Sequence, residues 1–119
     1  MTVGEVIKKV EKHRPGVNIS LCEYLSCLGG LEQRIYTDII SAHEGNKELV
    51  PLSEDSEMLV PDMYGDLYCF WMLARIDLAN GDTAGYTNNM ILYNSLMSSF
   101  SDHYTRSHMP KARGRLRWR

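Results

Sequence analysis

Histidines, serines and carboxylates are the side chains of this chain that could perform acid–base or nucleophilic chemistry or bind a metal ion. His103 and His108 are five residues apart, so on a helix they do not share a face as two zinc ligands would. The serines of residues 98–101 adjoin Asp102 and His103, but neighbours on one helix cannot converge as nucleophile, base and orienting group. We therefore expect no enzyme active site, no metal site and no cofactor.

The three cysteines offer no obvious ligand set either. Cys22 and Cys27 would point roughly 140° apart on a helix, which is a poor arrangement for sharing a metal ion. An odd number of cysteines indicates reduced thiols. We expect these two residues and Cys69 to fill the core as small hydrophobic side chains.

The C-terminal nine residues are the strongest candidate for a binding segment. They carry five positive charges and no negative charge. Three interpretations stand: a solvated arm, a phosphate-binding arm, or a segment that docks in an acidic groove of another protein with a tryptophan anchor. The candidate partner-binding residues are Lys111, Arg113, Arg115, Arg117, Trp118 and Arg119.

The rest of the chain is acidic. Residues 1–110 hold eight basic and fifteen acidic side chains, a charge of −7 within the total of −2 for 119 residues. Such a field weakens any general attraction to nucleic acid. The length predicts one domain, residues 1–110, followed by the basic tail, residues 111–119. No apolar run approaches the ~20 residues that span a bilayer, so we expect no membrane partner.

Hydrophobic periodicity predicts an all-α fold, a bundle of four helices. The first helix begins with a capping box of Thr2 and Glu5 and ends at residues 15–16. The second extends from about Ser20 to about Ala42; Gly29 and Gly30 in its middle predict a close backbone approach or a bend. Its expected buried residues are Leu21, Leu25, Leu28, Leu31, Ile35 and Ile39.

An irregular acidic loop separates the second and third helices. Its short extended pieces at 48–52 and 58–60 could pair as a small hairpin. The loop has a net charge of about −4. Its candidate residues are Glu44, Glu48, Glu54, Asp55 and Glu57.

The third and fourth helices carry most of the aromatic residues. The third begins after Pro61, with Asp62 as its cap, and ends at residues 80–81; its expected buried face is Leu67, Phe70, Trp71, Ala74 and Leu78. The fourth is capped by Asp82 or Thr83 and extends to about His108. Its apolar stripe has the sharpest periodicity in the chain and consists of Tyr86, Met90, Tyr93, Met97, Phe100 and Tyr104.

Four stretches of the chain carry a family resemblance. Residues 74–82 (ARIDLANGD), 86–89 (YTNN), 103–110 (HYTRSHMP) and the opening 2–7 (TVGEVI) resemble small phage and prophage neck proteins. These are the head–tail connector, or adaptor, proteins of tailed phages. The likeness covers most of residues 1–110, and its motifs are structural rather than catalytic.

The resemblance implies a structural virion protein at the head–tail interface, present in the host cytoplasm during assembly. It implies a ring of copies, dodecameric, below the portal protein, which extends the DNA channel and supports a stopper or tail-completion protein. Genomic DNA would pass through without specific binding. The acidic loop would then suit a channel wall or an intersubunit contact, because like charges repel. The family's C-terminal segment commonly engages the portal, and residues 109–119 correspond to it by position.

Two other classes of function remain open at this point. A small nucleic-acid-binding module would use the basic tail as its phosphate contact, and its DNA affinity would fall steeply with salt. A small enzyme or regulator would need a pocket with converging polar groups, which the residue pattern does not supply.

Overall fold

The computed structural model describes residues 1–16, 18–40 and 51–107, and within these ranges the chain is all-α. It contains four α-helices: α1 (Val3–His13), α2 (Leu21–Ile35), α3 (Asp66–Ala79) and α4 (Thr83–Ser107). A π-helical turn, η1 (Tyr36–Ile40), continues α2, and a 3-10 turn, η2 (Asp62–Tyr64), precedes α3. The expected all-α arrangement of four helices is confirmed.

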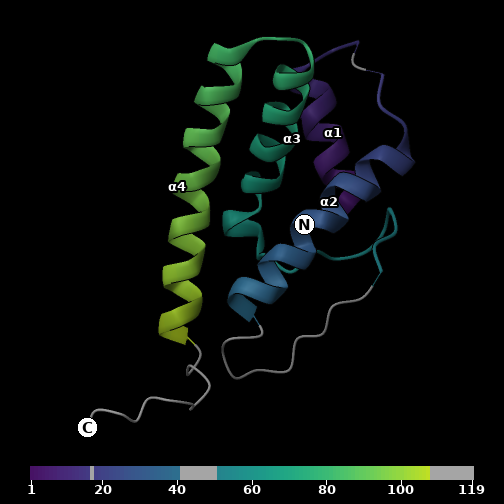
Figure 1. The fold of residues 1–119 in the computed structure, drawn as a ribbon. Coiled ribbons are helices and arrows are strands. Elements are labelled where there is room, and N and C mark those ends of the chain that lie inside the picture. The colour runs from purple at the N-terminus through teal and green to yellow at the C-terminus, as the bar shows by residue number, and fades with distance from the viewer. Residues whose placement is uncertain (17, 41–50, 108–119) are drawn as a thin grey trace, which may run out of the picture.

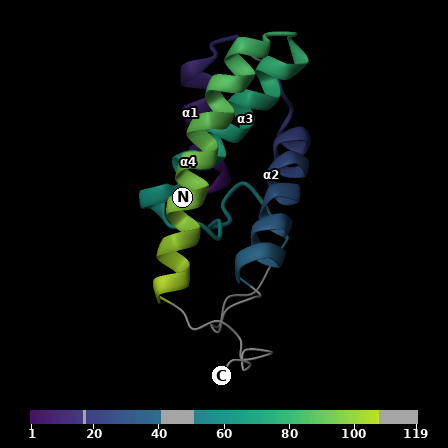
Figure 2. The same ribbon diagram turned by 60° about the vertical axis from the view of Figure 1, so that its left-hand side comes forward.

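Helix α3 is the centre of the molecule. It forms an antiparallel hairpin with α4, packs against α1, and touches α2 at far fewer points (Figures 1 and 2). The sequence pattern predicted one buried face for α3, but neighbours surround it, and residues 67–69, 71–74, 76 and 77 are all buried. The expected burial of Leu78 is wrong, because this side chain is 47% exposed, and Phe70 is buried only in part.

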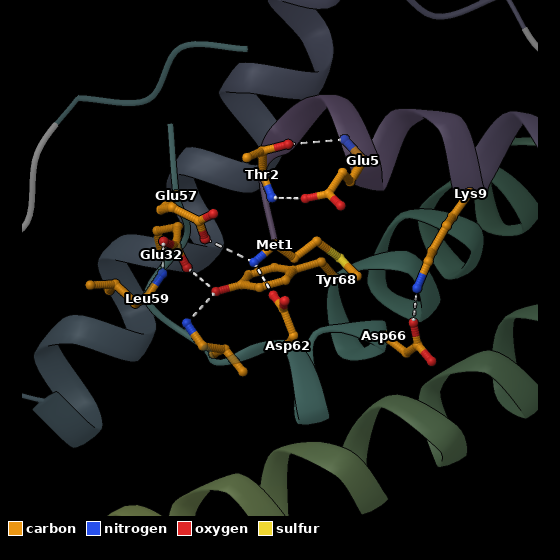
Figure 3. Close-up of polar contacts among 11 residues, drawn as sticks. Met1, Thr2, Glu5, Lys9, Glu32, Glu57, Leu59, Asp62, Asp66 and Tyr68 are labelled. Carbon is orange, nitrogen blue, oxygen red and sulfur yellow. Dashed lines mark hydrogen bonds and ion pairs between the residues drawn. The ribbon is translucent and has the colours of Figure 1, made fainter. Parts of the chain in front are cut away.

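Helix α1 begins and ends as the sequence predicts. The Thr2 hydroxyl accepts a hydrogen bond from the Glu5 amide at 3.3 Å, and the Glu5 carboxylate accepts one from the Thr2 amide at 2.9 Å (Figure 3). This reciprocal capping satisfies two amides that the first turn would otherwise leave unpaired. The buried face of α1 consists of Val3, Val6 and Val10.

Helix α2 keeps most of its expected buried face. Ser20 caps it, accepting a hydrogen bond from the Glu23 amide at 3.2 Å. Of the six expected residues, Leu21 is wrong because it is 42% exposed, Leu25 is half-buried, and the other four are buried. The buried side also includes Tyr24 and the charged Glu32, which were not expected there. A Cβ added at Gly29 or Gly30 would meet nothing within 4 Å, so the expected close backbone approach is wrong.

The segment before α3 packs against the N-terminus, and the hairpin expected between residues 48–52 and 58–60 lies partly outside the described residues. The Met58 amide donates to the Met1 carbonyl at 3.1 Å, and Glu57 forms an isolated antiparallel bridge with Thr2. Residues 58–60 are buried in the core, while residues 48–50 lie outside the described ranges. Asp62 starts η2 and pairs with the Met1 amino group, so its expected role as the cap of α3 was wrong.

Helix α4 confirms its predicted start and stripe. Asp82 is the cap, because its carboxylate accepts from the Gly85 amide at 2.9 Å. Within the stripe, Tyr93, Phe100 and Tyr104 are buried, and the other three residues are half-buried at its edges. The preceding turn also agrees, since Gly81 has a φ of 77° that favours glycine.

The cysteines divide into two kinds. Cys22 and Cys27 are exposed, so the expectation that they fill the core was wrong; Cys69 alone is buried. Burial, followed by the nearby Asp66 carboxylate, raises the pKa of the Cys69 thiol to about 11, although Lys9 acts in the opposite direction.

We expect a thiol reagent such as Ellman's reagent at pH 8 to label two cysteines rapidly and the third only on unfolding. The thiolate is the reactive form, and a pKa near 11 leaves Cys69 with about one thiolate per thousand molecules at that pH, behind a packed surface. Stopped-flow labelling of the native chain and of Cys69→Ala measures this. Three equal labelling rates in the native protein would contradict the burial of Cys69.

Candidate partner-binding site

A single hollowed seam separates α2 from α3 and α4. Three adjoining cavities of about 410, 360 and 230 Å³ follow it from the start of α2 to η1. The first two share Cys27 and Arg75, and the last two share Leu31 and Arg34. We call this surface the α2 seam. It is open because small residues of α2, namely Ser26, Cys27 and Gly30, line its middle cavity.

Two arginines meet one tryptophan in the middle of the α2 seam. The guanidinium carbon of Arg75 lies 4.6 Å from the centroid of the Trp71 ring, and that of Arg34 lies 5.6 Å away. The indole face attracts both cations and holds them beside the groove. The Tyr93 ring of α4 packs on the same indole at 5.2 Å between centroids. The Trp71 side chain is 92% buried by this packing, so it is a fixed platform for the two arginines.

Neither of these two arginines is neutralised by a carboxylate within the described part of the chain. Lys9 pairs with Asp66 at 2.8 Å and Arg14 with Asp77 at 3.0 Å, whereas neither Arg34 nor Arg75 forms an ion pair with a carboxylate of residues 1–16, 18–40 or 51–107. A guanidinium group presents donors in a planar fork that fits a carboxylate or phosphate. The described residues thus place two such groups beside the middle cavity of the α2 seam.

Two buried polar networks connect the helices around the seam. The Glu32 carboxylate of α2 accepts a hydrogen bond from the Leu59 amide at 2.8 Å and another from the Tyr68 hydroxyl of α3 (Figure 3). The Tyr68 oxygen in turn accepts from the Val60 amide at 3.1 Å. Burial, and then the adjacent Glu32, raises the pKa of Tyr68, which keeps it a neutral donor. This network ties α2 to α3.

The second network ties α1 to the α3–α4 hairpin. The buried Asp77 carboxylate accepts from the guanidinium of Arg14 at 3.0 and 3.1 Å and from the side-chain amide of Asn89 at 2.8 Å. The close fit leaves no room at Gly85, where a Cβ would lie 2.6 Å from an Asp77 carboxylate oxygen.

The outer face of α4 forms a second surface with an unusual composition. Residues 83–101 contain no charged side chain, and Ile91 and Leu92 in their middle are 59% and 46% exposed. The central parts of protein–protein interfaces are depleted in charged residues and contain exposed apolar groups of this kind. We call this surface the α4 face.

The residues singled out from the sequence fall partly outside the described ranges. The tail candidates Lys111, Arg113, Arg115, Arg117, Trp118 and Arg119 lie outside them, as do Glu44 and Glu48. The structure brings the other three acidic residues together in one exposed turn beside α1. There the Glu54 carbonyl accepts from the Gly4 amide at 3.0 Å, and Glu57 pairs with the Met1 amino group at 2.9 Å.

The α2 seam and the α4 face were missed by reasoning from the sequence. Trp71 was assigned to the core from its spacing, which is correct for its burial but does not reveal the two arginines beside it. Arg75 follows it by one helical turn, a spacing that places both on one side of α3. Arg34 comes from a different helix, so no local pattern could show it.

Comparisons with protein-family models, with curated proteins and with solved structures find no match to this chain. Within residues 1–16, 18–40 and 51–107, no three His, Cys, Asp or Glu side chains come together as a group that could hold a metal ion. The helices of these same residues include none long and apolar enough to cross a membrane.

Proposed function

We propose that this chain is a structural protein of the phage neck, a head–tail connector that forms a ring below the portal protein. In this role it extends the DNA channel, supports a stopper or tail-completion protein, and lets genomic DNA pass without specific binding. The proposal places it at the head–tail interface of the virion and, during assembly, in the host cytoplasm. The sequence resemblance of residues 2–7, 74–82, 86–89 and 103–110 to connector proteins supports it.

The observation that carries the proposal is that one small helical body has two surfaces of different character, the α4 face and the α2 seam. A closed ring uses heterologous contacts, in which each copy offers two different patches. The α4 face is uncharged and apolar at its centre, whereas the α2 seam is hollow and carries two guanidinium groups that no described carboxylate neutralises. A protein that works by assembly needs such surfaces.

The acidic turn fits the same role. Glu54, Asp55 and Glu57 are exposed on one side of α1. Like charges repel, so carboxylates on a channel wall would keep DNA from adhering. In this proposal the basic tail, residues 111–119, attaches the ring to an acidic groove of the portal, with Trp118 as its anchor.

Mixing experiments with purified portal protein test this function. We expect the protein alone to be monomeric or weakly associated, and light scattering to show a mass increase when portal is added at micromolar concentration. Truncation after Pro110 should leave the circular dichroism spectrum helical and abolish attachment. Trp118→Ala should weaken attachment by about 30-fold or more, beyond any single Arg→Ala change in the tail.

Two outcomes would overturn the proposal. An unchanged mass on mixing would exclude a portal adaptor, and normal attachment of the truncated protein would show that the tail is a solvated arm. The alternative function, a small nucleic-acid-binding module, predicts DNA affinity that falls with a logarithmic salt slope of about 0.9 per phosphate contact. That affinity would depend on the tail arginines more than on Trp118.

A further inference from the structure

We propose that the α2 seam binds an extended acidic peptide segment of a partner protein, with Arg34 and Arg75 gripping carboxylates at the middle of that segment. The inference rests on the described residues of α2, α3 and α4. It deepens the proposed function, because the seam is one of the two contact patches named there and the peptide segment would be what fills it. Neither arginine was assigned a role by the sequence patterns.

The shape of the seam favours a peptide over a single small anion. The three cavities adjoin along the whole of α2 and η1, a length of about 30 Å at the rise of a helix. An extended segment of about nine residues spans this distance. A free phosphate or carboxylate would occupy only the middle cavity and leave the cavities on either side empty.

The order of charges along the seam sets the chemistry of the occupant. Glu23 lines the first cavity, Arg75 and Arg34 line the middle one, and Asp38 lines the last. The sequence of charges is therefore negative, positive, positive, negative. A partner segment fits best when its acidic residues are central and its ends are uncharged or basic.

The walls of the two outer cavities add an apolar requirement. Ile19, Met72 and Ile76 line the first cavity, and Ile35 and Met97 line the last. Apolar side chains at the ends of the segment would be buried there, and the removal of their surface from water would add to the binding free energy. The expected ligand has acidic residues in the middle and apolar residues toward both ends.

The same charge order disfavours nucleic acid. A single strand presents one phosphate per nucleotide along its whole length, so its outer phosphates would face Glu23 and Asp38. The described residues also contain thirteen acidic and seven basic side chains, a field that repels every anion, and a strand charged at each nucleotide more strongly than a peptide with two or three carboxylates. A short peptide with two or three carboxylates concentrates its charge where the arginines are.

Selection from a yeast-displayed library of random nonapeptides tests the proposal. The intact chain is used as the labelled target, and the double variant Arg34→Gln/Arg75→Gln as the counter-target. We expect enrichment of peptides with at least two central acidic residues flanked by apolar ones. Synthetic copies should change the fluorescence of Trp71, measured with Trp118→Phe so that Trp71 is the single tryptophan of the chain.

Matched variants separate the seam from the rest of the surface. The double arginine variant should bind the selected peptides at least tenfold more weakly, whereas Lys8→Gln/Lys12→Gln, which removes two exposed charges of α1, should not change binding. Gly30 lines the middle cavity and Gly29 does not, and a Cβ at either is free of clashes. Gly30→Gln should therefore weaken binding by filling the groove, and Gly29→Gln should leave it unchanged.

Three results would overturn the inference. The first is that enriched peptides show no preference for central acidic residues. The second is that selected peptides bind the double arginine variant as tightly as the wild type. The third is that a twelve-nucleotide single-stranded DNA binds the seam in preference to them. Circular dichroism of each variant excludes unfolding as the cause of lost binding. None of these results bears on attachment to a portal through residues 111–119.

Discussion

Replacing Arg14 by alanine is expected to lower the free energy of unfolding by about 3 kcal/mol. The variant leaves the Asp77 carboxylate buried, with the amide of Asn89 as its remaining side-chain donor. Removing one partner of a buried ion pair costs about 3–5 kcal/mol. We expect the lower end of this range because water reaches the Arg14 side chain, which is 38% exposed, although the Asp77 side chain is only 4% exposed. Urea unfolding followed by circular dichroism measures the change, and the melting temperature should fall by roughly 10 °C or more.

A double-mutant cycle and a matched control make this expectation specific. Lys12→Ala removes an exposed charge two residues earlier and should change stability by less than about 0.5 kcal/mol. Arg14→Ala/Asp77→Ala should be less destabilised than the sum of its two single variants, because the unpaired carboxylate is gone. A melting temperature of Arg14→Ala within 2 °C of wild type would show that the pair does not connect α1 to the α3–α4 hairpin.

The parts of the fold that the sequence predicted are those determined by local interactions. The capping box of Thr2 and Glu5, the cap at Asp82 and the stop at Gly81 each depend on residues within four positions of one another. The stripe of α4 was predicted for a related reason, since one side of that helix packs on α3 and the other faces solvent. Amphipathic periodicity is informative when a helix has one packed side.

The parts that were missed depend on contacts between distant segments. Helix α3 is surrounded, so its burial follows from the arrangement of its neighbours and leaves no one-sided pattern to find. Glu32 was overlooked because a charged residue is normally exposed, and its donors come from residues 59 and 68. Residues 57 and 58 pair with the N-terminus, which is a contact between distant segments that no local pattern shows.

The candidate site followed the same division. A run of charges in the tail is visible in the sequence, and its role stays a prediction because residues 108–119 lie outside the described ranges. The α2 seam requires Arg34, Trp71 and Arg75 from two helices to meet, which is a property of tertiary structure. The absence of charge from residues 83–101 was visible in the sequence, but its meaning depends on knowing that Ile91 and Leu92 face outward.

The Glu32 network leads to the second large expected effect. Glu32→Gln should lower the free energy of unfolding by about 2 kcal/mol, the typical worth of hydrogen bonds to a charged group. The carboxylate accepts from both the Leu59 amide and the Tyr68 hydroxyl. A glutamine offers one acceptor oxygen and places an N–H group toward one of these donors. Tyr68→Phe should have a similar effect, since it removes the donor to Glu32 and the acceptor for the Val60 amide.

Because this network ties α2 to α3, its loss should also alter the α2 seam. We expect acrylamide to quench the fluorescence of Trp71 more strongly in Glu32→Gln than in the wild type. Both proteins carry Trp118→Phe in this measurement, so that Trp71 is the tryptophan observed. Glu11→Gln, which changes an exposed carboxylate of α1, should leave both stability and quenching unchanged. If Glu32→Gln lowers stability without affecting quenching, the α2–α3 spacing is set by the apolar contacts of Leu28, Leu31 and Ile35 alone. If it changes neither, the buried carboxylate is not a structural link between the two helices.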